Sequence, residues 1–147
     1  PAFKKIRKIS SRKKSESFMN SDLTFEDLYN RSLDDFTYEL ENINDSIYIL
    51  TSFPKENLNS SYSKHISWIQ PSDLLIYKEE SYGINNTLTK TKEIKYTNIK
   101  GFDLVEEIKV RDVKTKHETY LKFNEVEINS GIKDSQFHEL NLKRIPI

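Results

Sequence analysis

The sequence contains no cysteine and only three glycines and four prolines. Without cysteine the chain can form neither a disulfide nor a thiolate metal site, and this absence fits cytoplasm and periplasm equally well. Three glycines cannot build the glycine-rich loop that cradles a nucleotide phosphate. No run of eighteen apolar residues is present, so no segment is expected to span a bilayer as a helix.

Motifs of catalysis and metal binding are also missing. There is no GxSxG and no HExxH, and His65, His117 and His138 lack a spacing that would place two imidazoles on one metal ion. The acid pairs Glu79-Glu80 and Glu106-Glu107 point to opposite faces of a strand, so neither pair converges on one substrate. The sequence therefore predicts a protein that is not an enzyme, with no catalytic residue, no metal site and no cofactor.

The formal net charge is zero, but the charges are distributed unevenly. Residues 1–14 carry seven cations and no acid, whereas residues 15–45 carry nine acids against Arg31 alone. The basic segment could contact phosphates of nucleic acid or of lipid head groups, or it could be a lysine-rich strand that discourages edge pairing. Because the whole chain is neutral and only Phe3 is interleaved with the cations, no nucleic-acid partner is predicted.

Most of the chain alternates between apolar and polar residues with a period of two, which is typical of β-strands. A length of 147 residues fits one domain, and eight tyrosines with eight phenylalanines argue against disorder. The predicted strands cover residues 36–41, 47–53, 65–69, 74–82, 87–99, 102–113 and 117–128. About seven strands joined by short turns, such as Lys100-Gly101, predict an antiparallel meander.

Helical patterns are confined to two short stretches. Asp22 or Thr24 is expected to cap the first helix. The second is predicted over residues 134–142, where Phe137 and Leu140 would be buried. Two short helices cover little of a seven-stranded sheet, so the sheet must curl on itself, pair with a partner or cover a ligand.

Apolar and aromatic residues on the predicted strands outnumber what two short helices could cover. They either pack tightly or line a cavity for a large apolar ligand, and the sequence alone leaves both interpretations open. The residues concerned are Phe36, Tyr38, Leu40, Tyr48, Leu50, Trp68, Tyr77, Tyr96, Phe102 and Phe123.

Residues 1–28, PAFKKIRKISSRKKSESFMNSDLTFEDL, resemble the central motif of the outer-membrane lipoprotein-sorting protein family, which has the LolA/LolB-like fold. In that family a strand of the form LPALRKVRRI precedes a serine-rich loop and GSFMGSDFTYEDL. The likeness continues in LDDFTYEL, SSYSKHISWI and FNEVEINSGIKDSQFHELNLKR. Glu16 and Asn20 stand where the family has glycines, and of the two Asn20 is better suited to a left-handed backbone.

The resemblance implies a mainly β fold: a strongly curved antiparallel sheet, an incomplete barrel of about seven strands with two short helices and a hydrophobic concave face. It implies a periplasmic carrier of lipid or lipoprotein acyl chains for sorting to the outer membrane, with an inner-membrane transporter as a candidate partner. Family members begin with further strands and a helix, so residues 1–147 are expected to be a single domain that is the carboxy-terminal part of a longer one. An open edge near residues 3–9 would then favour self-association.

The expected ligand-binding residues come from two places. Residues 17–28 would form a gating lid or a fixed plug over the concave face, because a flexible thioether and flat rings adapt to mobile acyl chains. This segment contributes Phe18, Met19, Leu23 and Phe25. The sheet would contribute Phe36, Tyr38, Leu40, Ile66 and Trp68 to the same cavity.

Two other functions remain open. One is a protein-interaction or scaffold module of the cell envelope with a filled core, which docks a partner through the basic segment or a sheet edge. The other is an enzyme, which would require polar side chains that converge in a cleft, such as Glu79 with His65 or His117.

Overall fold

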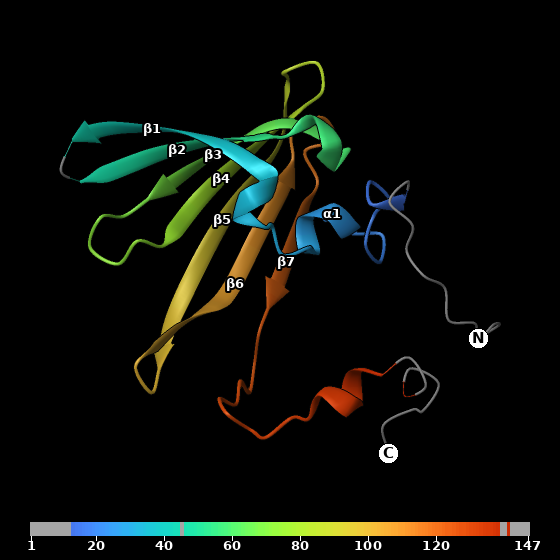
Figure 1. Ribbon diagram of the computed structural model, residues 1–147, viewed down its shortest axis with the longest axis vertical. Helices are drawn as coiled ribbons and strands as arrows, with labels where there is room; N and C mark the ends of the chain where they lie inside the picture. The colour runs from blue at the N-terminus through green and yellow to red at the C-terminus, as the bar shows by residue number, and fades with distance from the viewer. Residues whose placement is uncertain (1–12, 45, 139–140, 142–147) are drawn as a thin grey trace.

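The computed structural model describes residues 13–44, 46–138 and 141 (Figure 1). These residues form one bent and twisted antiparallel sheet of seven strands in sequential order, with β1 and β7 at its edges. The strands are β1 (Phe36–Asn44), β2 (Ile47–Pro54), β3 (Tyr62–Ile69), β4 (Ile76–Gly83), β5 (Leu88–Ile99), β6 (Phe102–Asp112) and β7 (Glu118–Lys122). The predicted mainly β meander is confirmed.

The turns explain where the strands end. Lys100 and Gly101, which join β5 to β6, both have positive φ angles of 53° and 84°, as the hairpin turn that matches strand twist requires. β7 ends at Lys122, earlier than the expected residue 128, and Glu125 within the expected strand has a positive φ angle of 55°. A left-handed backbone cannot continue an extended strand.

The first predicted helix is present as α1 (Phe25–Leu28). Thr24 caps it: its hydroxyl accepts a hydrogen bond from the Asp27 backbone N–H, and the Asp27 carboxylate accepts one from the Thr24 backbone N–H at 2.8 Å. This reciprocal capping box satisfies donors that a short helix would otherwise leave open. One-turn 3-10 helices, η2 (Leu33–Asp35) and η3 (Glu56–Leu58), flank β1 and β2.

The second predicted helix is only one 3-10 turn, η4 (Asp134–Phe137). The prediction that Phe137 is buried is wrong, because 75% of this side chain is exposed. In Figure 1, η4 lies apart from the seven strands. Leu140 lies outside the described residues.

The two faces of the sheet differ in what covers them. Cross-strand partners share a face, and the register aligns Ser52, His65, Ser81 and Lys90 in one row over β2 to β5. Lys90 contacts Asp27 of α1, so we call this side the covered face. The opposite side is the open face.

Burial beneath α1 is unusually polar. Only four hydrophobic side chains of the described residues are buried: Leu23, Phe36, Tyr62 and Val110. The buried polar side chains on this face are Ser52, His65, Ser67, Glu79, Ser81, Lys90 and Lys92, while Glu107 is buried on the opposite face, where it pairs with Lys95 and Lys122. Since buried charges are costly unless paired, the interior must hold a connected network of ions.

Candidate functional site

Asp27 links α1 to the middle of the sheet. Its side chain is fully buried, and its carboxylate contacts the Nζ atoms of Lys90 at 2.7 Å and Lys92 at 3.4 Å. The Tyr62 hydroxyl donates a hydrogen bond to the same carboxylate at 3.0 Å. Because α1 has only four residues, these contacts rather than helical propensity must hold it on the sheet.

Glu79 of β4 is the second buried anion. Arg31, which follows α1, donates two hydrogen bonds to its carboxylate at 2.6 and 2.9 Å. Lys92 donates a third at 3.0 Å and so bridges Glu79 to Asp27. Ion pairs of this kind, with a bidentate guanidinium, are the strongest that side chains form.

The network holds both carboxylates ionised. Burial alone would raise the pKa of Glu79, but Lys92 and Arg31 outweigh it and lower the pKa to about 2. For Asp27, too, burial opposes ionisation, yet Lys92 and Lys90 lower its pKa well below the ordinary value. The folded structure therefore depends on these two anions staying charged.

His65 lies beside this network on β3 and is 2% exposed. Its Nδ1 atom lies 2.9 Å from the Ser81 hydroxyl and 3.5 Å from an amino group of Arg31. Burial and then the charge of Arg31 lower the pKa of His65 to about 4. The imidazole is therefore neutral near pH 7.

The buried histidine, serine and glutamate do not form a catalytic triad. Ser81 is completely buried, so its hydroxyl cannot reach a substrate. Glu79 approaches the same ring nitrogen as Ser81, at 3.9 Å, whereas a triad needs the acid and the nucleophile on different nitrogens. Within the described ranges, no group of three or more His, Cys, Asp or Glu side chains could hold a metal ion.

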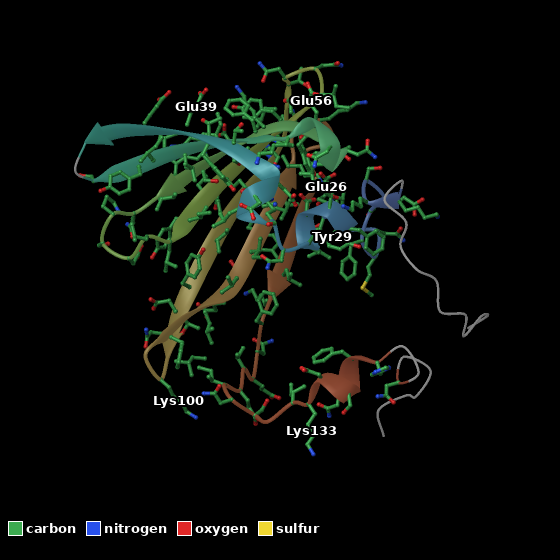
Figure 2. The ribbon with its side chains drawn as sticks, viewed as in Figure 1. Glu26, Tyr29, Glu39, Glu56, Lys100 and Lys133 are labelled. Atoms are coloured by element: carbon green, nitrogen blue, oxygen red, sulfur yellow. The ribbon has the colours of Figure 1, made fainter. Side chains whose placement is uncertain are left out.

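A small cleft opens next to the network, where the segment after α1 meets β1 and β3. Its volume is about 100 Å³. Arg31 and His65 contribute polar groups, while Phe36, Leu58 and Tyr62 contribute apolar walls. Glu26 and Tyr29, which also line the cleft, lie where α1 approaches the sheet (Figure 2).

Farther from α1 the covered face becomes apolar. The register aligns Tyr48 with Ile69, and it aligns Ile94 with Ile108 and Leu121. We call these side chains, with Leu50, the apolar floor: Tyr48, Leu50, Ile69, Ile94, Ile108 and Leu121. Each remains only half-buried in the described chain, so the floor is available to a further apolar group.

The four residues expected in a lid lie in different surroundings. Leu23 is buried, and Phe18 packs edge-on against Phe25 with ring centroids 5.8 Å apart. Met19 is 83% exposed. None of these four side chains lines the cleft.

The five expected sheet residues do not share one face. Phe36 is buried and lines the cleft, while Tyr38 and Leu40 lie on the covered face and are 41% and 63% exposed. Ile66 and Trp68 lie on the open face, so the prediction that all five line one cavity is wrong. Because side chains alternate along β3, Ile66 and Trp68 face away from His65 and Ser67. The Nζ atom of Lys78 lies 4.1 Å from the centroid of the Trp68 ring.

The charged network was missed at the sequence level. Alternating lysines at 90 and 92 look like the solvated side of a strand, and Arg31 looks like a surface charge. One feature of the sequence could have indicated the network: Arg31 is the only cation in residues 15–45, which contain nine acids. The pairing of Glu79 with His65, mentioned above only as a test for an enzyme, is present within the network.

The chain matches one family model and is similar to several solved structures. A family model described as "Uncharacterized protein" matches residues 1–144. A solved domain described as an outer-membrane lipoprotein-sorting protein, from Vibrio parahaemolyticus, is 26% identical with a TM-score of 0.89, and the match covers 98% of this chain and 63% of that one. A DUF1329 family protein from Desulfovibrio piger is 28% identical with a TM-score of 0.87, covering 97% and 62%.

A LolA superfamily protein from Nitrosomonas europaea is 21% identical with a TM-score of 0.68, over 86% of this chain and 59% of that one, which supports the fold alone. No curated protein matches the chain. The chain thus spans less than two thirds of the length of each solved protein. The expected LolA-like incomplete barrel is confirmed.

Proposed function

We propose that this chain carries acyl chains of lipids or lipoproteins on its apolar floor. The chain belongs to the family whose model, described as an uncharacterized protein, matches residues 1–144, and it is similar to a solved outer-membrane lipoprotein-sorting domain and to a DUF1329 family protein. The observation that supports this function is the set of half-buried apolar side chains on the covered face of β2, β3, β5, β6 and β7. A carrier needs such a surface, and a solved structure similar to this chain is described as a lipoprotein-sorting domain.

The energetics favour the floor over the cleft as the site for the chain. Burying a methylene group contributes roughly 0.8 kcal/mol, so ten methylenes would gain about 8 kcal/mol before ordering costs. A cleft of about 100 Å³ is well below the 300–1,000 Å³ that is usual for sites enclosing drug-sized ligands. The acyl chain would therefore lie along the apolar floor.

The similarity to a solved outer-membrane lipoprotein-sorting domain supports a cell-envelope setting. The carrier would work in the periplasm, receive its cargo from the inner membrane, with a membrane transporter as the candidate donor, and deliver it to the outer membrane. No helix among the described residues is long and apolar enough to cross a bilayer. Transfer of cargo would require no covalent step.

Displacement of the fluorescent dye N-phenyl-1-naphthylamine by lauroyl lipids, measured on the full chain, tests this function. Leu121→Asp places a charge on the floor and is expected to weaken lipid binding at least tenfold. Ile84→Asp introduces the same charge at a side chain that is 77% exposed, and it should leave binding unchanged. Equal affinities in both variants would contradict the proposal.

A protein-interaction module with a filled core is the second candidate. The fully paired ions beneath α1 favour it, because they fill the space that a deep lipid cavity would need. If no lipid displaces the dye or co-purifies with the protein in native mass spectrometry, this module becomes the better explanation.

A further inference from the structure

The cleft beside α1 contains an unused hydrogen-bond donor. His65 lines the cleft, and its Nε2 atom makes none of the hydrogen bonds found among the described residues. Every side-chain nitrogen or oxygen of these residues that is shielded from solvent has a hydrogen-bond partner. Since Nε2 has no such partner, it is accessible to solvent, and we take the cleft that His65 lines as the space it faces.

The neighbours of the other ring nitrogen fix the tautomer. An amino group of Arg31 lies 3.5 Å from Nδ1, and a guanidinium can only donate. We therefore assign Nδ1 as the acceptor of a hydrogen bond from the Ser81 hydroxyl, which lies 2.9 Å away. In a neutral imidazole the proton consequently sits on Nε2, so the cleft faces an N–H group.

The charges around the cleft are balanced. Four cations and four anions line the cleft or belong to the network beneath it: Lys14, Arg31, Lys90 and Lys92 against Glu26, Asp27, Asp35 and Glu79. An additional anion would have no cation of its own in this arrangement. An uncharged acceptor such as a carbonyl oxygen fits the site better.

The cleft is continuous with an apolar track along β1. Phe36 lines the cleft, and its ring lies 6.4 Å from that of Tyr38. Leu40 follows on the same face and pairs with Leu50 of the apolar floor. A molecule with its carbonyl at His65 can therefore extend an alkyl chain over Tyr38 and Leu40 to the floor.

We propose that the Nε2–H group of His65 binds the ester carbonyl of a glycerolipid acyl chain that lies on the apolar floor. This inference rests on the proposed function, and it adds that the carrier distinguishes acyl esters from other alkyl lipids. The small volume of the cleft suits the linkage region of such a lipid and excludes the rest of the molecule.

A matched pair of lipids tests the carbonyl directly. Monolauroylglycerol carries the ester, and 1-O-dodecylglycerol is an ether that lacks only the carbonyl oxygen. Both are titrated below their micelle concentrations against the bound dye on the full chain. The ester is expected to bind about fivefold more tightly, the effect of one neutral hydrogen bond.

Two substitutions of His65 separate a binding role from a structural one. His65→Gln keeps an acceptor toward Arg31 and an amide N–H near the position of Nε2, so the preference for the ester should persist. His65→Leu removes the donor and should bring the two affinities together. If the leucine variant does not fold, the ratios of ester affinity to ether affinity in the unaltered chain and in the glutamine variant still test whether His65 binds the carbonyl.

Each outcome is decisive. Equal affinities for ester and ether in the unaltered chain overturn the role of His65 but leave the carrier intact, since both lipids still bind. A preference that survives in a folded leucine variant also overturns it. If neither lipid displaces the dye, the proposed function itself fails and this inference with it.

Discussion

Arg31 and Glu79 are 48 residues apart in the sequence, yet their side chains form two hydrogen bonds of 2.6 and 2.9 Å. The guanidinium comes from the segment after α1 and the carboxylate from the centre of the sheet, so the pair fixes this segment over β4. Glu79 is almost fully buried, while Arg31 remains 30% exposed along its side chain. Arg31 also lines the cleft, so its guanidinium joins the cleft to the buried carboxylate of Glu79.

Glu79→Gln is expected to destabilise the fold by about 3–5 kcal/mol, because it leaves Arg31 and Lys92 without their buried counter-ion. Urea unfolding followed by circular dichroism measures this loss. The neighbouring Glu80 pairs with Lys78 at 2.7 Å on the open face, where Lys78 is 43% exposed. Glu80→Gln should cost less than about 1 kcal/mol, and a loss as large as that of Glu79→Gln would contradict the assignment.

The stability of the protein should fall as the pH falls from about 6.5 to 4. The folded protein lowers the pKa of His65 to about 4, so in this range the unfolded chain binds a proton that the folded one does not. By this linkage the loss amounts to about 3 kcal/mol. The lowered pKa values of Glu79 and Asp27 add a further loss below about pH 4.5.

His65→Gln separates these two ranges. It should remove the slope between pH 6.5 and 4, because glutamine does not titrate, and it should keep the steeper loss at lower pH. Thermal unfolding at a series of pH values provides the measurement. A slope that remains between pH 6.5 and 4 in this variant would assign the effect to another group.

The strands could be predicted from sequence because alternation and turns are local properties. Lys100-Gly101 marks its hairpin whatever the rest of the chain does. Which face Trp68 occupies is not local, since it depends on where α1 docks and a shift of one residue inverts every side chain. The ion network joins Asp27 to Lys90 over 63 residues, so no short window of sequence contains it.

Gly101→Ala is expected to destabilise the protein by roughly 1–2 kcal/mol through backbone strain alone. Gly101 has a φ angle of 84°, and no atom beyond its chain neighbours lies within 4 Å of the position a Cβ would take, so no steric clash contributes. Thermal unfolding measures the change. At Lys100, whose φ angle is 53°, Lys100→Asn should stabilise the same turn slightly, and a loss there would contradict this reading of the turn.

The loop that carries Phe18 and Met19 is attached to β7 through Asp22. The Asp22 carboxylate accepts a hydrogen bond from the Thr119 hydroxyl at 2.6 Å and contacts Nδ1 of His117 at 2.7 Å. The Asp22 backbone N–H donates to the same hydroxyl at 3.0 Å. Asp22→Asn weakens this attachment and should increase hydrogen exchange of residues 15–24 at least tenfold, as measured by mass spectrometry.

The same variant decides between a gating lid and a fixed plug. If the loop gates the floor, release of bound monolauroylglycerol to vesicles should accelerate together with hydrogen exchange, because both follow opening of the loop. A fixed plug predicts faster exchange with unchanged lipid release. Asp73 caps a distant turn by accepting from the Leu75 N–H at 2.9 Å, so Asp73→Asn should alter neither measurement. If Asp22→Asn leaves hydrogen exchange unchanged, Thr119 and His117 do not hold the loop, and the buried side chain of Leu23 is then its principal anchor.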